Sequence, residues 1–361
     1  MKTRVDIAVV GSGAAGIAAA VSAARAGCAT LLLDSRSAPG GTGGFSGLTT
    51  LCGLYDDSGN FLNGGFAREF AEALTSAPIK KGRVWVLPYR PARFQQLAAQ
   101  LVSTTPGLRA QWNTSLADVV MDAGRIVRLN GIEVGAVIDC SGTAAVAQAS
   151  GVETLVTDET TQASAVVFPL HNISRSLDVV ADMAQVLLPL ARAGFAPLNL
   201  QACQEPNAFT AKFAGTPEQV PQLLAFLRAH VHGFENCATS CQEFALTHRA
   251  GRMIIGQYVL TGDDVLAGRQ FPDAVARCSW PVEQWNAAGV AHFKYLPAGA
   301  QYEIPARSLR AARVENLFMA GKTISADVAA IASARVMGCG LATGAAAGVL
   351  AADFLNSSRI R

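Results

Sequence analysis

The fold is decided by a stretch near the start of the chain, Val5-Asp6-Ile7-Ala8-Val9-Val10-Gly11-Ser12-Gly13-Ala14-Ala15-Gly16. Residues 5–10 are mostly apolar and include β-branched side chains, which is typical of a buried parallel strand. Small residues at 17–26 predict a helix, and the apolar run at 29–33 predicts a second buried strand that ends at Asp34. Together these elements form a β-α-β unit, whose crossover makes the two strands parallel.

The glycine spacing of this unit indicates a dinucleotide site. Gly11 permits a tight turn after the strand, Gly13 lets the backbone approach a pyrophosphate, and Gly16 lets the helix pack closely on the sheet. The start of the helix faces the phosphate charge. Asp34 can accept hydrogen bonds from ribose hydroxyls. Because strand, glycines, helix, second strand and acid occur in register, the sequence predicts a Rossmann-like domain.

Three features favour FAD over a nicotinamide nucleotide. The glycine motif lies close to residue 1, a second glycine cluster at 40–44 follows Asp34, and Ala320-Gly321 follows an apolar strand before a glycine-bearing helix. FAD is long, so it needs contacts from several chain segments. No second GxGxxG motif occurs after residue 150, so no nicotinamide-binding domain is predicted.

The rest of the chain extends the α/β pattern. Residues 35–65 are rich in Gly, Ser and Thr, so we expect an extended loop there rather than a packed element. Further expected elements are a helix at 91–101, strands within 109–129 with a turn at 122–124, a buried strand at 136–139, a strand at 314–321 and a long final helix at 332–355.

The stretch from about 155 to 298 has a different composition. It holds all five histidines and two of the four tryptophans. We therefore expect an inserted α+β substrate domain at 155–298. Residues 1–154 and 299–361 would then form the FAD-binding domain, with a parallel sheet and a β-meander.

The composition excludes several classes of protein. Half of the 361 residues are hydrophobic and 16% are charged, which excludes a disordered chain. A net charge of +2 gives no reason to expect nucleic acid or an anionic membrane as a partner. Small residues interrupt the longest apolar stretches, and Asp6 and the glycines lie where a signal peptide would be apolar, so we expect a cytoplasmic protein. The eight cysteines form no CxxC or zinc-finger spacing, and no metal site is expected.

The chain as a whole resembles a known family. It is similar to the short FAD-dependent oxidoreductases of the glutathione-reductase-type FAD superfamily. The resemblance implies flavin chemistry without a nicotinamide domain, and a substrate held between the flavin and the inserted domain. It rests on residues 11–16, Asp34, 40–44, 256–261 with Asp264, 271–274, 302–309, 320–322 and 333–338. The motifs and the resemblance together give the expected FAD contacts, namely Gly11, Gly13, Ala14, Ala15, Gly16, Asp34, Ser35, Arg36, Gly41, Thr42, Gly43, Ser46, Ser141, Gly142, Gly321, Met337 and Gly338.

Some positions depart from the pattern of these relatives. Lys322 follows Gly321 where many superfamily members carry an aspartate. The segments at 249–253 and 283–285 also differ from the family's usual residues, so substrate roles are not transferred to them.

Five residues are candidates for the chemistry. The segment 333–340 is expected to open the final helix, so that its N–H groups and Arg335 stabilise negative charge on the reduced flavin ring. Tyr302 and Arg307 could anchor a substrate carboxylate or ketone, and His248 or His292 could accept a proton. The alternatives are an ion-paired Arg335, a Tyr302 that only packs, and structural histidines.

These features lead to one main functional hypothesis. The chain is expected to be an FAD-dependent dehydrogenase or oxidase in which a small organic substrate transfers a hydride to flavin N5. The alternatives are a flavin-binding subunit of a larger complex and an RNA-modification flavoprotein, against which the near-neutral charge argues. The substrate, the electron acceptor and the choice between a homo- and a hetero-oligomer stay open.

Overall fold

The main layer is a parallel sheet with an antiparallel extension. The computed structural model describes residues 4–157, 162–174, 181–203, 205–241 and 243–359. The sheet has seven strands in the order β6-β2-β1-β9-β8-β7, with β20 beside β9. Strands β1, β2, β6, β9 and β20 are parallel, whereas β7, β8 and β9 form an antiparallel meander. The strands are β1 (Arg4–Val10), β2 (Thr30–Leu33), β6 (Leu108–Gln111), β7 (Val119–Asp122), β8 (Arg125–Leu129), β9 (Ile132–Asp139) and β20 (Leu317–Met319). The mixed α/β fold with a parallel sheet is confirmed.

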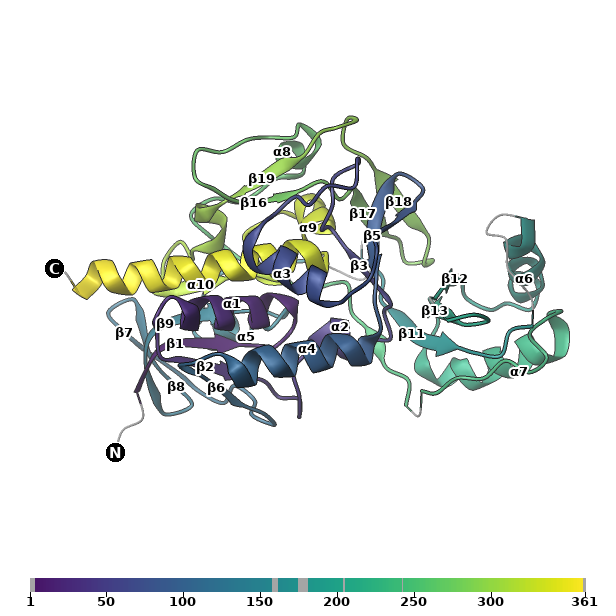
Figure 1. Ribbon diagram of the computed structural model, residues 1–361, viewed down its shortest axis with the longest axis horizontal. Coiled ribbons are helices and arrows are strands. Elements are labelled where there is room, and N and C mark those ends of the chain that lie inside the picture. Colours follow the sequence, from purple (N-terminus) through teal and green to yellow (C-terminus); the bar gives the residue numbers. More distant parts are fainter. Residues whose placement is uncertain (1–3, 158–161, 175–180, 204, 242, 360–361) are drawn as a thin grey trace.

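Two helices with small side chains lie against each other over this sheet. They are α1 (Ala14–Arg25) and α10 (Met337–Arg359), which run side by side in Figure 1. A Cβ atom added at Gly344 would lie 2.1 Å from the carbonyl oxygen of Ala15, and one at Gly348 would lie 2.5 Å from that of Ala19. Only glycine allows the two backbones to come this close. By length and composition alone α10 could also span a membrane, but its packing on α1 accounts for the same composition.

A second sheet forms its own layer, on the right in Figure 1. Its order is β12-β13-β11-β14, all antiparallel. The core of this layer contains Phe168, Phe213 and Phe234, and helices α6 and α7 contribute to it. The elements are β11 (Ala165–Leu170), α6 (Ala181–Arg192), β12 (Leu198–Ala202), β13 (Phe209–Phe213), α7 (Val220–His230) and β14 (Leu246–Thr247).

The chain leaves for the second sheet through β10 (Thr154–Val156) and returns through β15 (Arg252–Ile254), which pair with each other. The division into domains at 155 and 298 stays a proposal. Residues 158–161, 175–180, 204 and 242 of that range lie outside the described residues.

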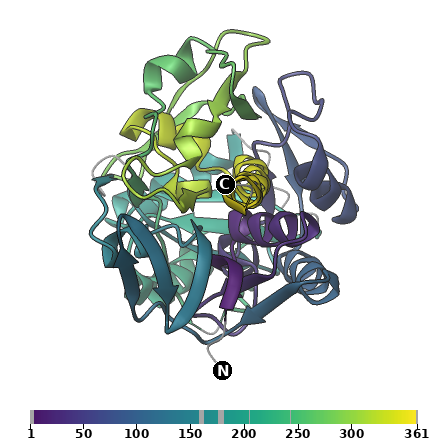
Figure 2. The same ribbon diagram turned by 90° about the vertical axis from the view of Figure 1, so that its left-hand side faces the viewer.

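The remaining elements lie around the two sheets and α10. Figure 2 views α10 end-on, with the parallel sheet below it and the segment of β16 and β19 above it. These elements are β3 (Thr50–Cys52), α3 (Gly65–Ala73), β4 (Ile79–Lys81), β5 (Val84–Pro88), α4 (Pro91–Thr104), α5 (Ala145–Ala149), α8 (Gly262–Leu266), β16 (Ala274–Cys278), β17 (Val282–Trp285), β18 (Ala291–Lys294), β19 (Tyr302–Pro305) and α9 (Val328–Ala334). Strand β5 pairs with β3 and β4, β16 with β19, and β17 with β18.

Two expectations about local structure are wrong. The stretch 35–65 is not only an extended loop, because it contains α2 (Gly41–Phe45) and β3. Gly43 and Gly44 let α2 pack directly on Phe94 and Gln95 of α4. The final helix is also not continuous: α9 ends at Ala334, the chain turns at 335–336, and α10 begins at Met337. The turn lets α10 pack along α1 while α9 packs against α8.

Candidate functional site

The glycine turn after β1 has the geometry that a tight turn requires. Gly11 has a φ of +97°, and a Cβ atom there would lie 2.5 Å from the carbonyl oxygen of Cys140. A Cβ atom at Gly16 would lie 1.7 Å from the carbonyl oxygen of Gly11. Both glycines are therefore required for the fold, because β1, α1 and the end of β9 meet here without side chains between them.

Gly13 differs from its neighbours because the space beside it is open. A Cβ atom at Gly13 would meet only the Cα atom of Gly41, at 4.0 Å. Gly13 is the N-cap of α1, and no side chain caps the N–H groups of Ala14, Ala15 and the following residue. An uncapped helix start beside open space attracts a phosphate group. The structure therefore has room for a pyrophosphate at this point.

The second glycine cluster lies directly against the first. The N–H group of Gly40 donates to the carbonyl oxygen of Ser12 at 2.9 Å. Gly41 has a φ of +47°, and a Cβ atom there would lie 2.6 Å from the Cα atom of Gly13. Thr42, Gly43 and Ser46 belong to the same short helix or its end. A dinucleotide held at Gly13 would therefore meet α2 as well.

Asp34 is placed where a ribose acceptor is expected, at the end of β2 beside the glycine turn. Its carboxylate accepts from the N–H and the hydroxyl of Ser12, both at 2.6 Å, and from the N–H of Arg36 at 2.8 Å. The guanidinium of Arg36 lies 5.5 Å from the centre of the Phe45 ring, and Ser35, Arg36 and Phe45 are all exposed. This exposed pair suits a flat base.

Other expected contacts gather at the same edge of the sheet. Ser141 and Gly142 follow β9, and the hydroxyl of Ser141 donates to Asp139 at 2.6 Å. Gly321 follows β20, and its N–H group donates to the hydroxyl of Thr343 at 3.1 Å. Ligands of parallel α/β sheets bind at the carboxyl ends of the strands. The residues present thus fit a long dinucleotide.

The start of α10 lies against the segment after β3. A Cβ atom at Gly338 would lie 2.5 Å from the carbonyl carbon of Gly53, and one at Gly53 would lie 2.3 Å from the side chain of Val336. Met337 is half-buried beside them. Arg335 is therefore placed next to Cys52 and Gly53, at the turn between α9 and α10, rather than inside a helix as expected.

Arg335 belongs to a cluster of three charged side chains, with Glu283 of β17 and Lys212 of β13; we call it the charged cluster. Each of the three is half-buried, and each interacts electrostatically with the other two. One guanidinium nitrogen of Arg335 donates to the carbonyl oxygen of Glu283 at 3.3 Å. Within the described residues, Nε of Arg335 is buried without a hydrogen-bond partner.

The charge of Glu283 is held in place by two tryptophans. The indole N–H of Trp280 donates to one carboxylate oxygen at 2.9 Å, and that of Trp285 donates to the other at 2.7 Å. Burial would raise the pKa of Glu283, but Arg335 and the two indoles lower it below its usual range. Glu283 is therefore an ionised carboxylate at neutral pH.

Cys52 lies beside the charged cluster. Burial and the charge of Glu283 raise the pKa of its thiol to about 12. A thiol of this kind is protonated at neutral pH and is a poor nucleophile. It therefore adds no charge to the cluster.

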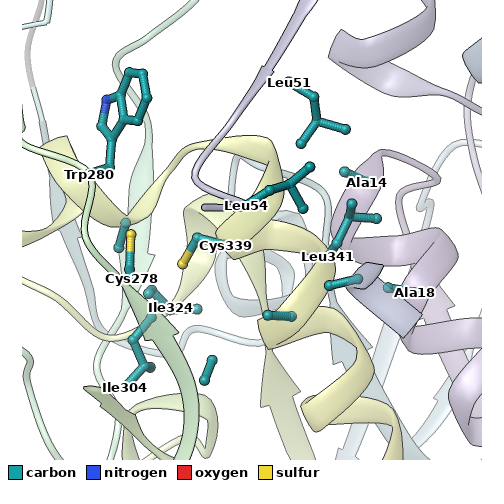
Figure 3. Close-up of a cluster of buried hydrophobic side chains, with 14 of the residues drawn as sticks. Ala14, Ala18, Leu51, Leu54, Cys278, Trp280, Ile304, Ile324, Cys339 and Leu341 are labelled. Carbon is teal, nitrogen blue, oxygen red and sulfur yellow. The ribbon is translucent and has the colours of Figure 1, made fainter. Parts of the chain in front are cut away.

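Tyr302 does not reach a substrate. Its side chain is 0% exposed, and its hydroxyl is hydrogen-bonded to Ser333 at 2.8 Å. Cys278 and Cys339, which are hydrogen-bonded to each other, lie beside it; Figure 3 shows these two sulfurs facing each other between β16 and α10. The expectation of a substrate anchor is wrong here, because Tyr302 is part of the core.

Arg307 forms an ion pair away from the charged cluster. Its guanidinium pairs with the carboxylate of Asp273 at 3.0 and 3.2 Å and lies over the ring of Tyr258. The side chain is 46% exposed on the surface. This pairing gives Arg307 a structural role, and its assignment as a substrate anchor stays a prediction.

The two candidate histidines occupy different positions. His292 is exposed and lies opposite Gln284 in the β17–β18 hairpin, whereas Glu283 lies opposite Phe293. Because alternate residues of a strand point to opposite faces, His292 faces away from the charged cluster and is excluded as its base. His248 is hydrogen-bonded to Ser164 at 3.0 Å, and its carbonyl oxygen accepts from Lys322 at 3.1 Å. It therefore stays a candidate near the ends of β9 and β20.

Trp280 also lines a cavity of about 240 Å³. Tyr55, Trp85 and Tyr295 form further aromatic parts of its wall. Arg83 lies over the ring of Tyr295 at 4.3 Å. The Trp280 indole thus connects this cavity with the carboxylate of Glu283.

Lys212 is not predicted from the sequence as a site residue, and the segment of Glu283 is named there only as a departure from the family's usual residues. A signal for Lys212 was nevertheless present in Phe209-Thr210-Ala211-Lys212-Phe213, where apolar and polar residues alternate. Such alternation indicates a strand with one polar face.

Comparisons with known proteins show the family and the fold. A family model described as FAD-dependent oxidoreductase matches residues 6–210 and 198–359. A search of curated proteins found no match. Among solved structures, a geranylgeranyl bacteriochlorophyll reductase-like protein from Thermoplasma acidophilum is 12% identical, with a TM-score of 0.55, covering 99% of this chain and 80% of that one. GidA from Aquifex aeolicus is 12% identical with a TM-score of 0.53, covering 98% of this chain and 64% of its own. The flavin-dependent brominase Bmp2 is 10% identical with a TM-score of 0.52, and the match covers 98% of this chain and 80% of the brominase chain. At these identities the three structures show the shared fold alone.

Proposed function

The chain belongs to the FAD-dependent oxidoreductase family, and from this premise we propose that it is a dehydrogenase or oxidase of a small organic substrate. When bound, FAD supplies the acceptor for a hydride from the substrate carbon. The chain holds FAD with the glycine turn at 11–16, with Asp34 and with the segments after β9 and β20. The substrate is oriented by the chain's own charged groups.

The observation that carries this proposal is Arg335. Its guanidinium is half-buried at the turn before α10, one of its donors has no partner among the described residues, and Glu283 lies beside it. A buried donor without a partner is costly, so it suits a group that a ligand satisfies. The carboxylate or carbonyl oxygen of a substrate would supply that acceptor.

The proposal is tested by asking what reduces the flavin. The yellow protein is mixed anaerobically in a stopped-flow instrument with NADH, with NADPH and with a panel of small organic acids, alcohols and amines. We expect an organic compound to bleach the flavin and neither nucleotide to do so. The reason is that no second GxGxxG motif, which would bind a nicotinamide nucleotide, follows the motif at residues 11–16. Bleaching within a second by either nucleotide would identify a reductase instead.

A further inference from the structure

Lys212 lies on the polar face of β13. Phe209, Ala211 and Phe213 are buried in the core of the second sheet. Because side chains alternate along a strand, Thr210 and Lys212 point to the opposite face. The backbone therefore directs the Lys212 side chain out of the core of its own sheet.

That opposite face is fixed against β3. The hydroxyls of Thr49 and Thr210 are 2.8 Å apart, and the side-chain amide of Gln201 donates to the hydroxyl of Thr50 at 2.9 Å. Lys212 follows Thr210 by two residues, as Cys52 follows Thr50, and the two side chains interact electrostatically. Lys212 is thus held in the layer between the second sheet and the FAD-binding part.

The charges in this layer do not balance. The charged and titratable groups that act on Lys212 or respond to it come from five segments, and they are Cys52, Lys81, Arg249, Glu283 and Arg335. The Cys52 thiol is protonated, so Glu283 is the single anion in this set. Positive charge in a partly desolvated layer attracts an anionic ligand.

We propose that the charged cluster is the substrate site, that its substrate is a small anion whose oxidised carbon carries a hydroxyl or amino group, and that Nζ of Lys212 accepts the proton of that group. This inference rests on the proposed function. Arg335 binds the anionic group. The substrate C–H bond breaks and its hydride goes to FAD, the O–H or N–H bond breaks and its proton goes to Lys212, and a C=O or C=N bond forms. The substrate loses two electrons and two hydrogen atoms, and FAD gains the two electrons.

The neighbouring groups favour Lys212 over Glu283 as the proton acceptor. Burial lowers the pKa of Lys212, so its neutral amine is present at a lower pH than in water. The carboxylate of Glu283 has a lowered pKa and is already bound by two indole N–H groups, so it is a weak base. Its negative charge instead keeps Arg335 in place.

The first experiment measures anion binding without turnover. Benzoate and acetate are titrated into the FAD-bound protein while the visible flavin spectrum and the heat of binding are recorded. We expect Lys212→Met and Arg335→Gln to raise the Kd at least tenfold. Lys80→Met, which removes an exposed lysine of β4, should leave it unchanged. Absence of binding to the wild type, or equal Kd values in all variants, would overturn the anion site.

The second experiment observes Lys212 itself. The chain has only six lysines, so reductive ¹³C-methylation gives a simple NMR spectrum of dimethyl-lysines. We expect a resonance that titrates below the exposed lysines and disappears in Lys212→Met. Titration of the Lys212 resonance together with the exposed lysines would overturn its role as base.

With a substrate found in the screen, the kinetics of a Lys212 variant test this inference separately from the proposed function. Lys212→Arg keeps the positive charge but cannot accept a proton near neutral pH, so it should retain KM, lose at least 100-fold in kcat and lose the rise of kcat with pH. Unchanged kcat in this variant would reject Lys212 as base and leave the proposed function standing. Reduction by NADH or NADPH would reject the proposed function, while the two binding experiments would still report on the anion site.

Discussion

Replacing Gly13 with valine tests the FAD cradle, because the structure predicts a small effect on folding and a large loss of cofactor binding. Gly13 has a φ of −71° and a ψ of −173°, which is extended backbone open to any residue. The nearest atom to an added Cβ is the Cα of Gly41, at 4.0 Å. The folded state of Gly13→Val should therefore stay within about 0.5 kcal/mol of the wild type.

The cost to FAD binding is much larger. The added side chain occupies the open space in front of the uncapped N–H groups of α1, where the pyrophosphate would bind. Each charge-assisted hydrogen bond is worth about 1.5–3 kcal/mol. The loss of two such bonds weakens FAD by about 3–6 kcal/mol, or roughly 100- to 20,000-fold in Kd. The purified variant should be colourless.

Flavin content and thermal unfolding are measured on the same preparations. Gly16→Ala is the matched comparison, because its Cβ would lie 1.7 Å from the Gly11 carbonyl oxygen and should destabilise the fold itself. Gly13→Val should lose flavin yet match the melting temperature of the wild-type apoprotein. A Gly13→Val protein with one flavin per chain would refute the placement of the pyrophosphate.

Three further variants probe other parts of the structure. Asp34→Ala should weaken FAD by about 1.5–3 kcal/mol through loss of a charged acceptor, measured by titrating the apoprotein; an unchanged Kd would assign the ribose to another residue. Tyr302→Phe removes the hydroxyl bonded to Ser333 and should cost about 1 kcal/mol in urea unfolding, while a loss of flavin reduction without that cost would restore its role as an anchor. The lowered pKa of Glu283 stabilises the fold above the unfolded pKa of about 4.3, and this stabilisation is lost as the pH falls through the folded pKa. The stability deficit of Glu283→Gln should therefore shrink between pH 7 and pH 3, and a constant deficit would contradict the lowered pKa.

Local patterns were enough to predict the FAD-binding part. The β-α-β unit, the turn at Gly11 and the position of Asp34 depend on residues within about 30 positions of one another, and their spacing follows from the geometry of strand, turn and helix. The helix at 91–101 was found for the same reason, since α4 has apolar residues at helical spacing and Pro91 at its start.

The charged cluster could not be predicted in this way. Lys212 lies on the second sheet, whereas Glu283 lies on β17 and Arg335 in the turn after α9, so the three meet only after the second sheet packs against β3. Periodicity predicts which face of a strand is polar, but not which other segment that face meets. The burial of Tyr302 was missed for a similar reason, because a motif at 302–309 indicates a family position without showing which side of the strand contacts the core.

The close packing of α1 on α10 has a consequence for how the chain is made. Ala15 and Gly344 touch although about 330 residues separate them, so α10 must meet α1 before this part of the fold is complete. At about 5–20 residues per second, a ribosome needs roughly 15–65 seconds to synthesise that interval. During this time the alanine stripe of α1 has no partner helix, and the nascent protein carries an unfinished FAD site. The FAD-binding part can therefore complete its fold only after α10 has left the ribosome.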